Sequence, residues 1–457
     1  MCNLKLVKNQ NIMLVLRKRS TLLAVSFLTA ALCFCFSAIQ ARAVEPSAAP
    51  SVYTLEQAVL RGLQANPQVA AVRAALLGSE FGEKAAKADF YPALSANYGF
   101  AYDDKPMLGG DREAWTLNIN LSQPLFTGWR LLNTHQQSQL VTEQVQTQLE
   151  NIELNLILLI QEQFLALLKA RENVRSAQDA VIRLQSQLQT AQAFFDVGLR
   201  PRLDVLQAEV ELAQAEQLLL VAQNTVATQV ARLNTLLNLD LDAPVEYVGD
   251  LTYLPYAPIL QDSLDNAFRQ RPDLILAGKA EEIADKDVEI VASNLYPQIT
   301  ADLDYFQRGN DPSVSGSGAR PDPWWTAGVV LRWRAFEWGR TRYATEQARQ
   351  NVNRLREETA NLRLEVSFEV KSLHLKLEEA SARIAVARKA LEEAREGFRI
   401  AQARFQAQVG TNTDVLDAQS RLTQSEALLT DALADYQLAL ARLFAAVGER
   451  NPGLVLP

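Results

Sequence analysis

The stretch VSFEVKSLHLKLEEASARIAVARKALEEAREGFRIAQARF, residues 366–405, places an apolar residue at alternating intervals of four and three positions. These positions are Val366, Val370, Leu373, Leu377, Ala380, Ile384, Ala387, Leu391, Ala394, Phe398, Ala401 and Phe405. An unbroken period of 3.5 residues is typical of a left-handed coiled coil, because it keeps one seam of the helix turned toward its partner. Glutamate, arginine and other polar residues occupy the remaining faces, which places this helix in water rather than in lipid.

The same period resumes after a short polar stretch. The apolar positions of this second arm are Val415, Ala418, Leu422, Leu429, Ala432, Tyr436, Ala439 and Leu443. Two consecutive heptad arms predict a long helical hairpin. Many seam positions are alanine, which permits close packing but buries little apolar area, so the hairpin needs several neighbouring helices.

An earlier segment of the chain carries a second hairpin of the same kind. Its first arm has the seam positions Leu156, Ile160, Leu167, Val174, Val181, Leu188 and Phe195, with Gln163 as the polar exception, and its second arm has Val205, Ala208, Leu212, Ala215, Leu219, Ala222, Val226 and Leu233. The first arm runs from about Trp129 to Asp196, a span of 68 residues. A helix of that length reaches ~100 Å, which is several bilayer thicknesses. The hairpins must therefore project far from any membrane that holds them.

Both hairpins belong to one duplicated unit. Asn66-Pro67 recurs 205 positions later as Arg271-Pro272, and the landmarks from Trp115 to Arg232 all recur 210 positions later. A constant offset over more than 110 residues indicates two copies of one structural unit. The five extra residues of the second copy lie in a loop, Arg308–Pro323, that is rich in Gly, Pro, Ser and Asp.

Ahead of each hairpin, two segments of about ten residues alternate apolar and polar side chains. The four apolar sets are Leu94, Ala96, Tyr98, Phe100 and Tyr102; Trp115, Leu117, Ile119 and Leu121; Ile299, Ala301, Leu303 and Tyr305; and Trp325, Ala327, Val329, Leu331 and Trp333. A period of two predicts strands, and ten residues suit a tilted strand that crosses a bilayer. An amphipathic sheet in a soluble protein would show the same alternation.

The tryptophans favour the membrane interpretation. All six fall within or beside two of these strands: Trp115, Trp129, Trp324, Trp325, Trp333 and Trp338. Aromatic residues at strand ends are typical of the girdles at a membrane interface, so we expect outer-membrane lipid around them. Four strands cannot close a barrel, and an open sheet edge in lipid leaves backbone groups unpaired at several kcal/mol each. Several chains must therefore share one barrel.

Residues 1–43 have the pattern of a secretory signal peptide. Arg17, Lys18 and Arg19 precede an apolar run, and Ala41-Arg42-Ala43 has the small-x-small form of a cleavage site. All three cysteines lie in this segment, so the exported chain is predicted to have no disulfide. Removing the segment changes the formal net charge from −8 to about −14, which argues against nucleic acid as a partner.

These patterns divide the chain into five predicted parts. They are a signal peptide (1–43), a first repeat of helix, two strands and long hairpin (44–238), a proline-containing linker (239–262), a second repeat of the same elements (263–448) and a C-terminal tail (449–457). The helix that opens each repeat is expected at Ala58–Asp89 and at Ser263–Asn294.

Essentially all of Val52–Gly448 resembles the TolC family of outer-membrane efflux proteins. The motifs that carry the resemblance are Asn66-Pro67, Tyr91-Pro92, Gln123-Pro-Leu-Phe126, Gly198 with Asp204-Val-Leu, and Val409-Gly-Thr411 with Asp414-Val-Leu-Asp-Ala418. The resemblance implies a mixed α and membrane-β fold, in which four strands per chain contribute to a trimeric twelve-stranded outer-membrane barrel above a long periplasmic coiled-coil α-barrel. It also implies a homotrimer that docks to a periplasmic adaptor (membrane fusion) protein. Through the adaptor it would serve an inner-membrane transporter of the RND, ABC or MFS type, in efflux or in type I secretion.

The resemblance places the adaptor contact at the two hairpin turns. The residues concerned are Val197, Gly198, Leu199, Val409, Gly410 and Thr411. Glycine at these turns also fits a helix C-terminus, where a left-handed residue ends the helix, and both interpretations hold together. The ungapped repeat sets Gln408 opposite Gly198, and matching the two glycines requires a two-residue shift.

Asp414 and Asp417 match acidic residues that line the family's periplasmic constriction, and Asp204 is the repeat equivalent of Asp414. Rings of like charge near the axis favour cations and repel one another when the tips close. The alternative role is helix capping, because aspartate is a favoured N-cap. We favour the cap for Asp204 and the gate for Asp414 with Asp417. The resemblance also implies basic and tyrosine partners that hold the gate shut. Arg200 and Arg202 are available for this in the first tip, and no tyrosine lies near the second.

Other functional classes fit less well. The chain has only two histidines, His135 and His374, both on predicted long helices, and no phosphate-binding loop or nucleophile motif. We therefore predict no enzymatic activity, no metal and no cofactor. A periplasmic adaptor would have one hairpin and a soluble β-domain, and a purely structural coiled coil would lack the strands.

Overall fold

The computed structural model describes residues 51–104, 112–314 and 322–454. The chain divides into two units, Met1–Ser51 and Val52–Pro457, and almost all of the described residues belong to the second. The predicted signal peptide at 1–43 and the three cysteines within it lie outside the described residues.

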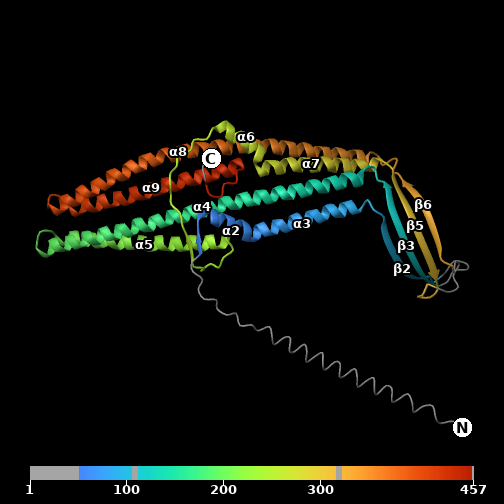
Figure 1. Cartoon of the computed structure of the whole chain (residues 1–457), viewed down its shortest axis with the longest axis horizontal. Coiled ribbons are helices and arrows are strands. Elements are labelled where there is room, and N and C mark those ends of the chain that lie inside the picture. The colour runs from blue at the N-terminus through green and yellow to red at the C-terminus, as the bar shows by residue number, and fades with distance from the viewer. Residues whose placement is uncertain (1–50, 105–111, 315–321, 455–457) are drawn as a thin grey trace, which may run out of the picture. The chain divides into compact units, whose positions relative to one another are not determined.

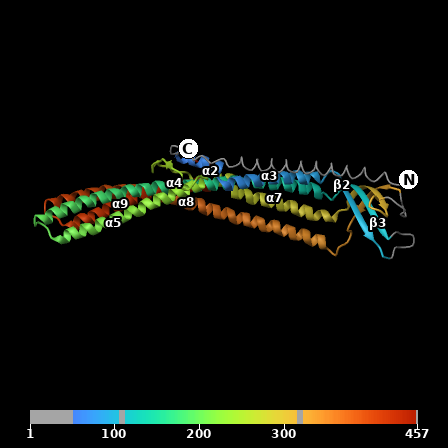
Figure 2. The same ribbon diagram turned by 90° about the horizontal axis from the view of Figure 1, so that it is seen from below.

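Two long helical hairpins form most of the second unit. The first consists of α4 (Arg130–Asp196) and α5 (Arg202–Leu236), and the second of α8 (Arg340–Gln406) and α9 (Asn412–Val447). The two views in Figures 1 and 2 show both turns at one end and the strands at the other. The predicted hairpins are confirmed, and the arm expected to span 68 residues has 67.

The heptad seam of α8 is buried along most of its length. All eight seam residues from Val366 to Leu391 are buried, as is Phe405, whereas Ala394, Phe398 and Ala401 are half-buried. In α4 the buried residues include Ile160, Phe164 and Leu167, which pack against the N-terminal helix and the linker. One stretch of α4 is long and apolar enough to cross a membrane by composition, and half of it is buried in this core. Packing therefore accounts for its apolar character.

The helical stretch ahead of each repeat's pair of strands consists of two helices. A single helix was expected at Ala58–Asp89 and at Ser263–Asn294. The first repeat has α2 (Leu55–Ala65) and α3 (Pro67–Ala88), and the second has α6 (Leu260–Gln270) and α7 (Pro272–Ala292), followed by the short 3-10 turn η1 (Ser293–Leu295). Each break falls directly before a proline, which keeps the preceding residue extended and starts a new helix as its first residue.

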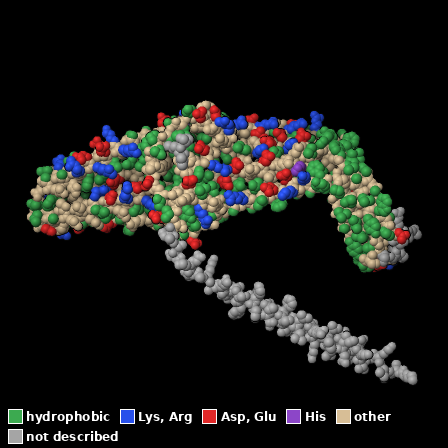
Figure 3. Space-filling view, in the orientation of Figure 1, with side chains coloured by type: hydrophobic (Ala, Val, Ile, Leu, Met, Phe, Trp, Pro, Cys, Tyr) green, Lys and Arg blue, Asp and Glu red, His purple; other side chains and the backbone are tan. Residues whose placement is uncertain are grey.

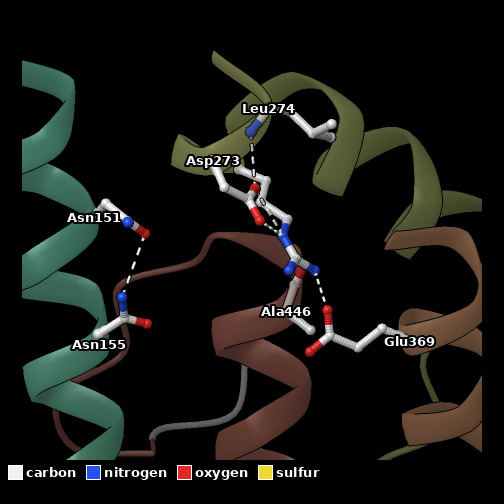
Figure 4. A network of polar contacts seen from close by, with 7 residues as sticks. Asn151, Asn155, Asp273, Leu274, Glu369 and Ala446 are labelled. Atoms are coloured by element: carbon white, nitrogen blue, oxygen red, sulfur yellow. Dashed lines mark hydrogen bonds and ion pairs between the residues drawn. The ribbon is translucent and has the colours of Figure 1, made fainter. Parts of the chain in front are cut away.

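The residue at each break makes the same tertiary contact. Asn66 Nδ2 donates to the carbonyl oxygen of Leu236 at 3.1 Å, and Arg271 Nη1 donates to the carbonyl oxygen of Ala446 at 3.2 Å. Both contacts join the kink to the end of that repeat's own hairpin. Arg271 also forms ion pairs with Asp273 at 2.9 Å and with Glu369 of α8 at 2.6 Å (Figure 4). The duplication is therefore present in the packing as well as in the sequence.

The four predicted strands form one antiparallel sheet in the order β2-β3-β5-β6. Their bounds are Ala93–Tyr102, Glu113–Phe126, Gln298–Gly309 and Trp324–Arg332. The register aligns the predicted apolar residues in rows such as Leu94, Leu121, Leu303 and Ala327, and it aligns Ser95, Asn120, Asp304 and Thr326 on the other face. Figure 3 shows hydrophobic side chains over this sheet, while charged side chains cover the helices. Among the described residues, β2 and β6 each pair on one side only, so both outer edges are open.

A second, smaller sheet has two strands. It pairs β1 (Ser51–Tyr53) with β4 (Val245–Tyr247) of the linker. Tyr247 is fully buried, and its hydroxyl donates to Asn234 Oδ1 at 2.7 Å. Burial raises the pKa of Tyr247 well above its usual range, so the phenol stays neutral as a hydrogen-bond donor.

Two consecutive left-handed residues join each strand to its long helix. They are Gly128 and Trp129, with φ of 63° and 64°, and Trp338 and Gly339, with φ of 50° and 82°. The repeat offset sets Gly128 opposite Trp338, so the two residue types exchange places between the copies. A Cβ at Gly128 would lie 2.5 Å from the carbonyl oxygen of Ser293. The first junction therefore requires glycine for space as well as for its backbone angles.

Gly128→Ala is expected to destabilise the protein by at least about 1–2 kcal/mol, the cost of a left-handed non-glycine residue, and to lower the Tm of the purified protein. Gly78→Ala is the matched control, because Gly78 lies inside α3 and a methyl group added there would have no neighbouring atom within 4 Å. That substitution should stabilise the helix by up to about 1 kcal/mol. Thermal unfolding measures both, and a Gly128→Ala variant as stable as Gly78→Ala would contradict the assigned junction.

Candidate functional site

The first hairpin tip is a tight turn that glycine permits. Gly198 has a φ of 75°, its N–H donates to Phe195 O at 2.8 Å, and the N–H of Leu199 donates to Phe194 O at 2.8 Å. This is the hydrogen-bond pattern that satisfies the last carbonyls of a helix. Val197 is 68% exposed and Leu199 is 52% exposed, so the turn presents two apolar side chains to solvent.

The second tip repeats this turn with glutamine in place of glycine. Gln408 has a φ of 64°, its N–H donates to Phe405 O at 3.0 Å, and the N–H of Val409 donates to Arg404 O at 2.9 Å. The ungapped repeat therefore describes the backbone correctly, and Gln408 is the structural equivalent of Gly198. Gly410 is buried two residues further on, where its N–H also donates to Arg404 O at 3.1 Å. Val409 is 67% exposed, which makes it the apolar residue presented by this tip.

Asp414 takes part in the start of α9. Thr411 is the N-cap: its hydroxyl accepts from the N–H of Asp414 at 3.1 Å, and Asp414 Oδ2 accepts from the N–H of Thr411 at 2.9 Å. This reciprocal pair is a capping box. The hydrogen bond from the Thr411 backbone lowers the pKa of Asp414. The carboxylate therefore supports the helix start above the ordinary aspartate pKa, and this support is lost as the pH falls through the lowered value.

Asp204 has a different environment at the equivalent position. The N-cap of α5 is Pro201, which offers no side-chain hydrogen bond, and Asp204 Oδ2 is buried without a partner among the described residues. The expectation that Asp204 is an N-cap is wrong, because both aspartates lie three residues inside their helices. Proline stands where the second repeat has Thr411, so the first repeat cannot form the capping box.

Asp414 and Asp417 lie one turn apart on α9 and are both exposed. With Arg421 they line a shallow groove of about 630 Å³ between α9 and α8. The structure thus brings the two predicted gate carboxylates together beside one guanidinium. Asp204 does not belong to this groove, and its carbonyl oxygen instead accepts from Asn412 Nδ2 at 2.9 Å.

Polar contacts fasten the two tips of one chain together. Arg200 Nη2 donates to Gly410 O at 2.5 Å, and its guanidinium lies over the buried Phe405 ring at 5.3 Å. Gln187 Nε2 donates to Asn412 Oδ1 at 2.8 Å inside the interface. Arg183 pairs with Glu426 at 3.2 Å further along α4 and α9. The sequence indicated Arg200 but not Gln187 or Asn412. The signal available for Gln187 and Asn412 was a polar residue at a helix position that packing buries.

The six tryptophans lie in three settings. Trp115 and Trp325 lie on the apolar face of the sheet, where they pair with Gly309 and Tyr305. Trp333 directly follows β6, and Trp129 and Trp338 lie at the strand-to-helix junctions. Trp324 lies on the polar face and stacks on Phe306 with ring centroids 5.3 Å apart. An interfacial role stays a prediction for the set, and Trp324 is the member whose face does not favour it. Among the described residues, no group of three or more His, Cys, Asp or Glu side chains is placed to hold a metal ion.

Comparison with known proteins adds a family match and a shared fold. The model of the family described as "Outer membrane efflux protein" matches residues 60–239 and 263–449. The outer membrane protein TolC of Vibrio cholerae serotype O1 is 22% identical over 366 residues, covering 78% of this chain and 82% of its own. The alkaline protease secretion protein AprF of Pseudomonas aeruginosa is 25% identical over 350 residues, covering 73% and 69%. The solved outer-membrane channel OprN has a TM-score of 0.75 at 20% identity, covering 87% of this chain and 90% of its own.

The left-handed Gln408 should weaken the second tip by about 1 kcal/mol relative to glycine. Gln408→Gly is therefore expected to slow amide hydrogen exchange at residues 404–411 roughly fivefold, and Gly198→Gln should accelerate exchange at residues 194–199 by a similar factor. Exchange measured by mass spectrometry on the purified protein tests both. Equal exchange in Gln408→Gly and the parent would show that the turn is not strained.

Proposed function

The chain belongs to the outer membrane efflux protein family, and we propose that three copies form a passive export channel through the outer membrane. The observation that carries the proposal is the four-stranded sheet with an apolar face, a polar face and two open edges. Three such sheets supply enough strands to close a barrel. In the closed barrel, each edge strand pairs with the edge strand of a neighbouring copy. The long hairpins then extend from the barrel into the periplasm.

The polar face of the sheet is suited to line a water-filled lumen. Asp304 Oδ1 accepts from Asn118 Nδ2 at 3.2 Å and from Asn120 Nδ2 at 2.9 Å, and Asp302 Oδ1 accepts from Ser122 at 2.6 Å. Charged groups with polar partners are stable in water and costly in lipid. The opposite, apolar face is therefore the one in contact with lipid.

The hairpin tips are the proposed contact with a periplasmic adaptor. Val197, Leu199 and Val409 are apolar and exposed at the end furthest from the strands, and Gly198, Gly410 and Thr411 shape the two turns. The adaptor would join the channel to an inner-membrane transporter. The name of AprF refers to secretion of a protease, so protein cargo and small-molecule efflux are both compatible with this architecture. Two hairpins and a membrane-type sheet in one chain do not fit an adaptor or a purely structural coiled coil.

Asp414 and Asp417 are the proposed gate. Their side chains are exposed at the tip and close in sequence to the turn that would meet neighbouring copies. Three pairs of carboxylates around an axis bind cations and repel one another. Asp204 contributes through its carbonyl contact with Asn412, which holds the first hairpin against the gate helix.

The assembly is tested by localisation, mass and conductance. We expect the chain, after removal of residues 1–43, to fractionate with outer membranes, to run as a complex of three chains in native mass spectrometry, and to conduct ions in planar bilayers. A soluble periplasmic monomer would contradict the proposed channel.

Asp414→Ala combined with Asp417→Ala is expected to raise single-channel conductance and to weaken block by divalent cations, because the charged ring is removed. Glu378→Ala with Glu379→Ala is the control, since it removes the same charge from exposed positions in the middle of α8. Because the pKa of Asp414 is lowered, block of the parent channel should persist to a lower pH than an ordinary aspartate would allow. Conductance that is unchanged in the tip variant would refute the gate.

A further inference from the structure

A cavity of about 840 Å³ lies where the sheet meets the long helices. The start of α4, the end of α7 with η1, and the first three turns of α8 surround it. Cavities of this size are typical of sites for small organic ligands. Its lining includes Trp129, Tyr296, Arg342, Tyr343, Arg349 and Glu289, so it combines aromatic rings with charges of both signs.

The cavity continues the apolar face of the sheet. The ring of Trp129 packs edge-on against Phe126 at 5.1 Å and against Tyr296 at 5.0 Å. Phe126 pairs with Ile299 on the apolar face. Trp333, the residue directly after β6, donates its Nε1–H to the carbonyl oxygen of Leu295, part of the cavity wall, at 3.1 Å. An acyl chain lying along the strands would therefore reach the cavity without crossing a polar surface.

The charges inside the cavity are only partly matched by the protein. The side chain of Arg342 forms no ion pair or hydrogen bond with any residue of the described ranges, and Arg349 lies 3.6 Å from Glu346 at an exposed position. The N-cap residues of α4 and α8 supply no side-chain hydrogen bond, and neither helix has an acidic residue in its first turn. Helix N-termini favour negative charge, and here they carry Arg130 and Arg340 instead. An anionic group in the cavity could therefore pair with Arg342 beside these helix starts, while Glu289 and Glu346 leave room for a cationic group as well.

We propose that this cavity binds the headgroup of a zwitterionic amino-phospholipid from the periplasmic leaflet of the outer membrane. Arg342 and Arg349 hold the phosphate through charge-assisted hydrogen bonds, and Glu289 with Glu346 faces the ammonium group. The acyl chains lie along Trp129 and Phe126 on the apolar face, and the aromatic rings occupy the interface between lipid and water. The inference rests on the proposed placement of the sheet in the outer membrane.

The lining favours a lipid over a free phosphate ion. Trp129 is 51% exposed, Leu295 52% and Tyr343 72%, and an inorganic ion would leave this apolar rim uncovered. The presence of two carboxylates also favours a zwitterionic headgroup over an anionic one, because a net negative lipid would meet Glu289 and Glu346 without a counter-charge. The site therefore predicts an order of binding: amino-phospholipid first, anionic phospholipid weaker, and diacylglycerol or inorganic phosphate weakest.

Native mass spectrometry of the intact assembly, purified in a maltoside detergent, tests this order. The complex is titrated with phosphatidylethanolamine, phosphatidylglycerol, diacylglycerol and inorganic phosphate in separate arms. Arg342→Gln with Arg349→Gln should raise the Kd for phosphatidylethanolamine at least tenfold, the change expected when two charge-assisted contacts are lost. Arg363→Gln with Arg395→Gln, further along the same helix and outside the cavity, removes the same charge and should leave the Kd unchanged.

Several results would overturn the lipid site. Equal phosphatidylethanolamine binding by the cavity variant and the control variant would do so, as would diacylglycerol binding as tightly as phosphatidylethanolamine to the parent protein, which requires no variant to fold. Tighter binding of inorganic phosphate than of lipid would identify an ion site instead. Fractionation and conductance of the same preparations separate this outcome from failure of the channel itself: a conducting outer-membrane trimer without selective lipid binding refutes only the lipid site.

Discussion

The architecture depends on the unpaired backbone groups at the two edges of one sheet. β2 and β6 each have one free side among the described residues, and every backbone group left unpaired in hydrocarbon costs several kcal/mol. The cost of a few such groups exceeds the free energy of unfolding of an ordinary domain, which is about 5–15 kcal/mol. A single copy is therefore not a stable membrane structure. In the proposed assembly, edge-to-edge closure with further copies sets the symmetry of the long hairpins and brings their tips around a common axis.

The periodic parts of the fold could be predicted from the sequence because their cause is local repetition. A spacing of 3.5 residues placed the buried residues of α8 from Val366 to Leu391, and a spacing of two placed the apolar rows of the sheet. The repeat offset even identified the structural equivalent of Gly198. Gln408 adopts the same left-handed conformation, although this conformation is unfavourable for a residue with a Cβ. Periodicity and register therefore carried more information than residue type at this turn.

Other features could not be predicted, because they depend on contacts between distant segments. The division of each opening helix at Asn66 and Arg271 was hidden by an otherwise continuous helical pattern, although the following proline was a signal. Gly128 is required in the left-handed pair Gly128 and Trp129 because a Cβ there would meet the carbonyl oxygen of Ser293. No local sequence pattern shows this contact. Gln187 and Asn412, 225 residues apart, become partners only when the two hairpins pack. The cap expected at Asp204 was misplaced by three residues, since the N-cap of α5 is Pro201.

The first tip has Pro201 at the position where the second has Thr411, so different contacts stabilise the two tips. The second helix start is stabilised within its own segment by the capping box of Thr411 and Asp414, whereas the first has no such box and is held by the contact of Asp204 O with Asn412. The links across the hairpins include hydrogen bonds, an ion pair and a ring contact from Arg200, together with apolar contacts of Phe194 with Phe405 and of Leu416 with Val181 and Leu184. Each hydrogen bond contributes only about 0.5–1.5 kcal/mol net, because water replaces it when it opens. The polar part of this interface can therefore separate and re-form at a small net cost in free energy, which suits the proposed gate at the tips.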